Sequence, residues 1–304
     1  GAAATRDKRG NRKEGRNADT TSVNLDEAIR IDLPPSVSHL KPIRFETVDG
    51  RGGWVTSLPG SRPIATPAYD KGMLFVGGGY GSYEFYGLDA RTGEVAWRTT
   101  TADDGPTAAV VEDGLVAFNT ESCSIIVCKA DTGSLVWQEW LGDPLMSQPA
   151  IDKGKLFLAY PAGQRQGKPF LGQKSHLMLC ADLFTGRHVW EREITGDVIT
   201  APVINDDQVF FTCFDGTAFC LDAENGGVQW RERTESTSAP LVVDDEVVMT
   251  EKIKRGRRSQ ESTLRRGRYQ GERRESMLNK EAAFLDYESD FEASGLSEDY
   301  SAAL

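Results

Sequence analysis

Short apolar runs separated by polar turns make up most of the sequence between residues 45 and 250. Typical runs are LFVG (74–77), LVAF (115–118) and LFLA (156–159). Runs of this length between Asp, Asn and Gly turns are typical of antiparallel strands joined by hairpins. Because this region has no helical period, the pattern predicts an all-β fold.

The strands recur in a repeating order. A short strand opens each period, and a polar turn and a second, more apolar strand follow it. Four segments share this design with a Pro as their second residue, and a fifth, AAVVEDGLVAFN (108–119), lacks the Pro. The four are TPAYDKGMLFVG (66–77), QPAIDKGKLFLA (148–159), APVINDDQVFFT (201–212) and APLVVDDEVVMT (239–250).

A Gly followed four residues later by a Trp marks the end of each period. The first full copy is GLDARTGEVAW (87–97), and five of the six tryptophans fit the repeat. The period is about 40 residues, and four strands in such a period predict one blade of a β-propeller. The sequence contains four complete blades of four antiparallel strands and the first two strands of a fifth (239–250).

The repeated segment resembles the tryptophan-docking motif of the PQQ-like, quinoprotein-type β-propellers. Two copies depart from it, since Lys129 replaces the Asp and Asn225 replaces the Thr. Because the motif recurs in every blade, we interpret it as a packing device between blades, whereas a ligand site is normally built once. Its residues are Trp54; Asp89, Thr92, Gly93 and Trp97; Gly133 and Trp137; Asp182, Gly186 and Trp190; and Asp222, Gly226 and Trp230.

The resemblance also implies how the chain is organised. Propellers of this family usually have seven or eight blades, so the visible blades predict an incomplete ring; a long insertion within blade five is the alternative. The Trp54 segment is expected to supply the strand that completes the last blade. Around the blades (41–250) we expect a flexible charged leader over 1–40 and a charged insertion or tail over 251–304, partly helical or disordered.

Charge narrows the range of partners. The formal net charge of −11 argues against nucleic-acid binding by the whole chain. Residues 252–274 are strongly basic, but only Tyr269 is available to stack on a base, so nucleic-acid binding is not favoured there either. The basic segment could equally lie against the acidic blades or the acidic residues 275–304. No apolar run is long enough to span a membrane.

One loop departs from the repeat. The third period is lengthened by PAGQRQGKPFLGQKSH (161–176), which contains no acidic residue. Long insertions in repeat proteins often carry binding residues, and the candidate partner contacts here are Arg165, Lys168, Phe170 and Lys174. A solvated loop without a binding role is the alternative.

No catalytic, cofactor-binding or metal site is predicted. The five cysteines include no CxxC pair, and the three histidines lack the spacing of metal ligands. The quinoprotein enzymes of the family use PQQ and calcium beside a vicinal Cys-Cys pair, which this chain lacks. We therefore expect neither cofactor.

The resemblance extends to the non-catalytic members of the family, such as the BamB scaffolds of bacterial outer-membrane assembly. It implies a propeller that binds outer-membrane or other envelope proteins, in the periplasm or associated with the envelope, although this chain contains no signal peptide. Two alternatives stay open: a fragment of a PQQ-dependent quinoprotein dehydrogenase, and a ligand-sensing propeller ectodomain.

Overall fold

The chain folds into strands joined by short connections, and none of the residues that the computed structural model describes is helical. The described residues are 38–47, 50–122, 124–142, 147–161, 164–165, 168–169, 176–234, 236–243, 246–255 and 259–268.

Four sheets of four antiparallel strands confirm the predicted blades. In each sheet the strands pair in chain order, and polar turns with left-handed residues, such as Lys71 (φ 44°) and Asp113 (φ 49°), join the first two strands. Blade 1 contains β3 (Ala68–Asp70), β4 (Met73–Gly77), β5 (Glu84–Asp89) and β6 (Val95–Thr100); blade 2 contains β7 (Val110–Glu112), β8 (Leu115–Asn119), β9 (Ser124–Lys129) and β10 (Leu135–Trp140); blade 3 contains β11 (Ala150–Asp152), β12 (Lys155–Pro161), β15 (His176–Asp182) and β16 (His188–Ile194); and blade 4 contains β17 (Val203–Asn205), β18 (Gln208–Thr212), β19 (Thr217–Asp222) and β20 (Val228–Arg233).

Two smaller sheets flank the four blades. Strand β1 (Ile43–Glu46) pairs with β2 (Gly52–Val55), while β21 (Leu241–Val243), β22 (Glu246–Arg255) and β23 (Ser259–Arg268) form a three-stranded sheet. The Trp54 segment, expected to complete the last blade, is β2, and in the described sheets it pairs with its neighbour in sequence, β1.

The last sheet corrects the predicted end of the blades. The sequence pattern predicts blades that end at residue 250 and a fifth blade of two strands, but β22 continues to Arg255 and pairs with a third strand, β23. Strand prediction depends on an alternation of apolar and polar residues. The many charged residues between 251 and 268 remove this alternation, so the sequence pattern did not predict these strands.

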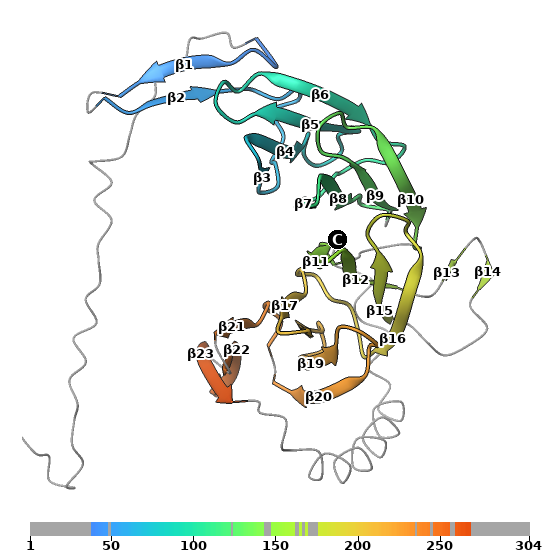
Figure 1. Ribbon diagram of the computed structural model, residues 1–304. Coiled ribbons are helices and arrows are strands. Elements are labelled where there is room, and N and C mark those ends of the chain that lie inside the picture. Colours follow the sequence, from blue (N-terminus) through green and yellow to red (C-terminus); the bar gives the residue numbers. More distant parts are fainter. Residues whose placement is uncertain are drawn as a thin grey trace, which may run out of the picture.

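The sheets are arranged around a common centre, as the blades of a propeller are (Figure 1). The first strand of each blade lies innermost, and the innermost strands of neighbouring blades contact one another in the order β3, β7, β11, β17 and β21. The described blades form an open arc, with β1–β2 at one end and β21–β23 at the other (Figure 1). This shape agrees with the predicted incomplete ring.

The antiparallel strand order gives the arc two different faces. Connections between the first and second strands of a blade, and between the third and fourth, lie on one side, which we call the turn face. Connections between the second and third strands, and from one blade to the next, lie on the opposite side, which we call the loop face. The loop-face connections are 56–67, 78–83, 101–109, 120–123, 141–149, 162–175, 195–202, 213–216 and 234–240.

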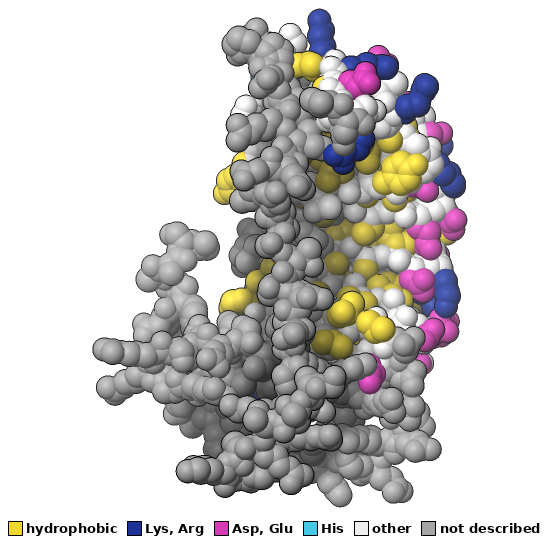
Figure 2. Space-filling model, turned by 90° about the vertical axis from the view of Figure 1, so that its left-hand side faces the viewer, with side chains coloured by type: hydrophobic (Ala, Val, Ile, Leu, Met, Phe, Trp, Pro, Cys, Tyr) yellow, Lys and Arg dark blue, Asp and Glu magenta, His cyan; other side chains and the backbone are white. Residues whose placement is uncertain are grey.

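Most buried side chains lie between neighbouring blades. Ala117, Val127 and Leu158, for example, belong to the cluster that joins blades 2 and 3, and similar clusters join the other neighbours. Trp54 packs against blade 1 in the same way. Viewed toward the open side of the arc, hydrophobic side chains form a broken band beside a rim of charged residues (Figure 2). The interfaces between blades therefore form the core of the molecule.

Candidate functional site

The repeated polar segments form tight turns on the turn face. In blade 1 the Asp89 carboxylate accepts hydrogen bonds from the backbone N–H groups of Arg91 (3.0 Å) and Thr92 (2.7 Å). The bond from Thr92 is the main reason why the pKa of Asp89 is lowered. Asp182 and Asp222 make equivalent pairs of bonds in blades 3 and 4. These carboxylates therefore stabilise their own turns.

Each turn supports the tryptophan of the preceding sheet. The ring lies over the Gly of the motif, so that a Cβ at Gly186 would come within 2.8 Å of Trp137 Cδ2. These glycines also have positive φ, for example +68° at Gly133, which L-residues rarely adopt. Each indole Nε1 donates a hydrogen bond to the carbonyl oxygen that follows the Asp position: Trp54 to Ala90 (2.9 Å), Trp97 to Ala130 (2.8 Å), Trp137 to Leu183 (2.8 Å) and Trp190 to Ala223 (3.0 Å).

The copies that depart from the motif keep its geometry. In blade 2 the carbonyl of Lys129 still accepts a hydrogen bond from the Gly133 N–H (2.8 Å). In blade 4 the side-chain oxygen of Asn225 accepts from the Gly227 N–H (2.7 Å), the part that the hydroxyl of Thr92 plays in blade 1. Trp230 is buried, and the connection that follows β23, where the corresponding turn of the last sheet would lie, is outside the described residues. The backbone turn and the Gly–Trp contact are thus the constant features of the motif.

A histidine outside the motif joins the outer strands of blades 2 and 3. His188 on β16 contacts Glu139 on β10 through Nε2 (2.9 Å) and Glu191 through Nδ1 (2.8 Å). Glu191 also accepts a hydrogen bond from the Tyr160 hydroxyl (2.9 Å). The hydrogen bonds to Glu139 and Glu191 raise the pKa of His188 to about 9, so the imidazole is protonated at neutral pH. We call this group the His188 clamp.

We expect the His188 clamp to make stability depend on pH. The pKa is about 9 in the folded chain and about 6.5 in an unfolded one, so the stabilisation is complete below about pH 6.5 and is lost as the pH rises through about 9. Because the side chains are partly exposed, we expect a loss of about 1–2 kcal/mol. Urea unfolding of the wild type and of His188→Gln should therefore differ more at pH 6 than at pH 10, and an equal difference at both would contradict the clamp.

The predicted partner loop leaves blade 3 on the loop face. Arg165 in β13 (Gln164–Arg165) pairs with Lys168 in β14 (Lys168–Pro169), so the loop contains a small hairpin. The side chains of these two residues, and all of Phe170 and Lys174, lie outside the described part of the chain. The role of these four residues in partner binding stays a prediction.

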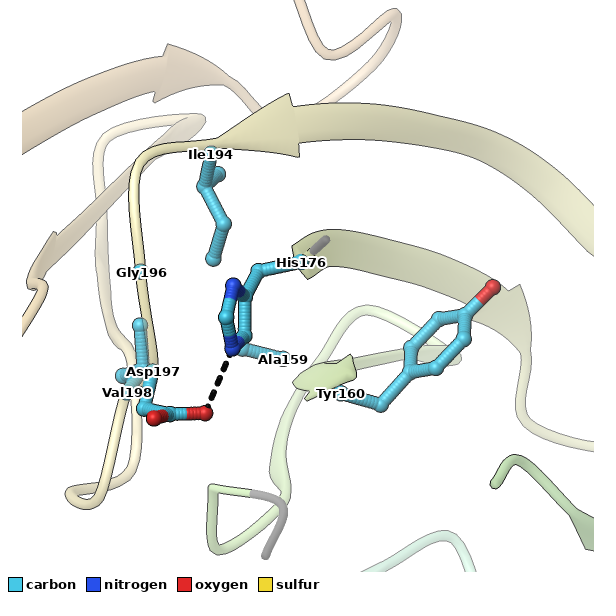
Figure 3. Close-up of a pocket in the computed structure, with 7 residues that line it drawn as sticks. All are labelled: Ala159, Tyr160, His176, Ile194, Gly196, Asp197 and Val198. Carbon is cyan, nitrogen blue, oxygen red and sulfur yellow. Dashed lines mark ion pairs between the residues drawn. The ribbon is translucent and has the colours of Figure 1, made fainter. Parts of the chain in front are cut away.

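An ion pair joins the end of this loop to the connection between blades 3 and 4. His176, at the start of β15, points its Nε2 toward Asp197 in the connection to blade 4, at 2.7 Å (Figure 3). Ala159 and Val198 line the same recess, whereas the hydroxyl of Tyr160 points away from the ion pair (Figure 3). The recess is too small to hold a water molecule, so it is a packing contact and not a ligand pocket.

Five large apolar side chains are exposed on the loop face, and the sequence analysis named none of them. Tyr80 is 73% exposed and Phe214 is 57% exposed; Ile64, Tyr83 and Ile199 are about half exposed. Hairpin turns usually consist of polar residues and glycine. The tyrosines in GGGYGSYEF (77–85) depart from this rule and could have indicated an exposed aromatic surface. Apolar side chains grouped on loops are typical of protein-binding surfaces.

The described residues offer few groups for catalysis. Cys128, Cys180, Cys213 and Cys220 are buried and unpaired, and burial raises the pKa of each thiol to about 12, so these thiols are protonated and unreactive. Within the described part of the chain, no group of three His, Cys, Asp or Glu residues is arranged to hold a metal ion. No helix in the same residues is long and apolar enough to cross a membrane.

Sequence comparison places the blades in a known family. The family described as outer membrane protein assembly factor BamB matches residues 43–165 and 157–268. The chain belongs to the BamB family. BamB of Nitrosomonas eutropha is 23% identical over 63% of this chain and 57% of its own length. BamB of Burkholderia pseudomallei is 24% identical over 71% of this chain and 67% of its own length. The chain thus spans only part of its BamB relatives.

A solved structure agrees with the fold expected of a BamB-family chain. The computationally designed Ika8 protein matches with a TM-score of 0.53 and 17% sequence identity, over 69% of this chain and 65% of that protein. At this level of identity the likeness concerns the fold alone.

Proposed function

We propose that this BamB-family chain is a non-catalytic scaffold that binds other proteins during outer-membrane protein assembly in the bacterial envelope. The observation that carries the proposal is the set of exposed apolar side chains on the loop face, described above. The family assignment supports it, since the relatives are outer membrane protein assembly factors. The repeated polar residues support it as well, because they are engaged in the turns between blades.

Hydrogen bonds tie together the connections that carry these side chains, in two groups. The connections that carry Ile64 and Tyr80 are tied together, because Arg62 Nη1 donates to the Tyr80 carbonyl (2.9 Å). The connections that carry Ile199 and Phe214 are tied by the Phe214 N–H, which donates to the carbonyl of Asp197 (2.6 Å). Connections whose backbone is restrained before binding lose less conformational entropy when a partner docks. Both groups are therefore suited to protein contacts.

The proposed scaffold binds neither PQQ nor calcium. The recurring carboxylates Asp89, Asp182 and Asp222 accept hydrogen bonds from their own turns. The four described cysteines are buried and lie apart in different strands or connections, unlike a vicinal pair beside a quinone. These features favour a scaffold over the quinoprotein alternative.

We expect Phe214→Ser to weaken capture of envelope proteins by at least about fivefold, since an exposed aromatic at an interface contributes about 1–2 kcal/mol. Affinity capture from a bacterial envelope extract, with mass spectrometry of the bound proteins, measures this. Phe184→Ser is the matched control, because Phe184 is 48% exposed but lies on the turn face. It should leave capture unchanged.

Equal losses for the two variants would contradict a binding role of the loop face. A rise in melting temperature on addition of PQQ and calcium, together with dye-linked oxidation of an alcohol or sugar, would overturn the scaffold proposal. That result would favour the quinoprotein alternative instead.

A further inference from the structure

One tryptophan lies outside the docking repeat. Trp140 is the last residue of β10, three positions after the docking residue Trp137. The other blades carry polar residues at this position, namely Thr100, Glu193 and Arg233. Because the blades repeat one design, a residue that breaks the pattern in one blade is not required by the fold. Trp140 is also 39% exposed, so part of its ring is accessible to a partner.

Trp140 lines a groove of about 170 Å³ where strands β9 and β10 of blade 2 meet the connection from blade 1. The other walls are formed by two residues in the connection from blade 1, Ala102 and Asp103, and by four on β9 and β10, namely Ser124, Ile126, Gln138 and Glu139. Cofactor and drug-sized ligand sites usually have volumes of about 300–1,000 Å³. The groove is therefore the right size for a single side chain.

A fixed negative charge lies in this groove. The Asp103 carboxylate accepts hydrogen bonds from the Ser122 N–H (3.0 Å), the Ser122 hydroxyl (2.8 Å) and the Thr120 hydroxyl. Burial opposes ionisation of Asp103, but these hydrogen bonds outweigh it and lower the pKa.

Two further acidic residues, Asp104 and Glu121, lie near Asp103. Burial raises the pKa of Glu121, and the charges of Asp104 and Asp103 raise it further. A positive charge placed in this groove is therefore attracted by the Asp103 carboxylate, and these neighbouring charges add to the attraction.

We propose that the groove binds a Lys or Arg side chain on an extended segment of a partner protein. The cation lies against the indole face of Trp140, which attracts it through the ring quadrupole, and Asp103 is its counter-ion. Strand β10 is the outermost strand of its sheet and pairs only with β9 among the described strands, so the segment can run along its outer edge. The proposal rests on the scaffold function and adds the chemistry of the partner.

Binding of a defined peptide to the full chain tests this proposal. The probe is a fluorescently labelled peptide of alternating Arg and Thr, and a matched peptide carries citrulline, which has the same shape without the charge. By fluorescence anisotropy we expect the Arg peptide to bind and the citrulline peptide to bind at least about tenfold more weakly. Trp140→Ala should weaken binding of the Arg peptide by about 3- to 10-fold, and Trp140→Phe by less, since a phenyl ring keeps part of the attraction.

Two matched variants separate a specific site from general attraction to an acidic protein. Asp103→Asn should weaken binding of the Arg peptide, whereas Glu94→Gln, which removes one exposed charge on the turn face, should not. Thr100→Ala changes the equivalent position of blade 1 and should also have no effect. The proposal is overturned if the Arg peptide does not bind, if Trp140→Ala binds it as the wild type does, or if Glu94→Gln weakens binding as much as Asp103→Asn.

Failure of the groove proposal can be distinguished from failure of the scaffold function. If Trp140→Ala leaves peptide binding unchanged while Phe214→Ser still reduces capture of envelope proteins, the groove proposal alone fails. If neither variant changes any interaction, both proposals fail.

Discussion

Replacing Trp97 with alanine is expected to lower the free energy of unfolding by about 3–5 kcal/mol, the range for large-to-small changes in a protein core. The Trp97 side chain is only 8% exposed, and its ring lies close to Phe75 and Phe85, with centroid separations of 6.0 and 6.2 Å. Its Nε1 also satisfies the buried carbonyl of Ala130. The variant would leave a cavity between blades 1 and 2 and an unpaired carbonyl oxygen. Urea unfolding followed by circular dichroism measures the change.

Trp140→Ala is the control for this prediction, because Trp140 is also a tryptophan but is 39% exposed, on the outer strand of blade 2. We expect it to cost less than about 1 kcal/mol. If the two variants were equally destabilised, the distinction between docking and exposed tryptophans would be wrong. Trp97→Ala should also leave the chemistry of the loop face intact in the molecules that remain folded.

Gly133→Ala is expected to cost about 3 kcal/mol or more, from two sources. The backbone at Gly133 has φ +68°, where an L-residue is strained by about 1–2 kcal/mol. In addition, the new methyl group would overlap the Trp97 ring and force the two blades apart. Urea unfolding measures the sum of the two effects.

A second glycine of blade 2 separates the backbone strain from the clash. Gly114 has φ +77°, but no atom lies within 4 Å of the position that its Cβ would take. Gly114→Ala should therefore cost only the strain of about 1–2 kcal/mol. In a Trp97→Ala background, the loss of unfolding free energy caused by Gly133→Ala should fall to the same value, because the ring that clashes with the new methyl group is absent. A cost that did not change in that background would show that Trp97 does not dock on Gly133.

The docking turns could be predicted from the sequence because their information is local. Asp89, Thr92 and Gly93 lie within five positions of one another and bond mainly to their own backbone. The same local pattern in four copies fixed the strand order of each blade. The prediction stopped short at residues 251–268, where dense charge replaces the apolar alternation even though β22 and β23 continue the sheet.

The candidate binding surfaces could not be predicted in the same way. Tyr80 and Phe214 belong to connections more than a hundred residues apart, and only the antiparallel order of the blades places them on one face. The His188 clamp likewise needs Glu139 from a different blade. The groove at Trp140 combines residues from the connection between two blades and from two strands. Such contacts depend on how sheets pack, which no local pattern records.

The sequence by itself determined the all-β class, the number of complete blades and the residues of each docking turn. These follow from short-range rules, since a hairpin or a Gly-containing turn is specified by residues that are neighbours in the chain. Only the tertiary structure decided that four tryptophans, Trp54, Trp97, Trp137 and Trp190, dock on the turn of the following blade. It alone also decided that charged strands extend the last sheet and which side chains remain exposed on the loop face. The physical reason is that burial is a property of the packed arc: a side chain is hidden or exposed according to which blade lies beside it.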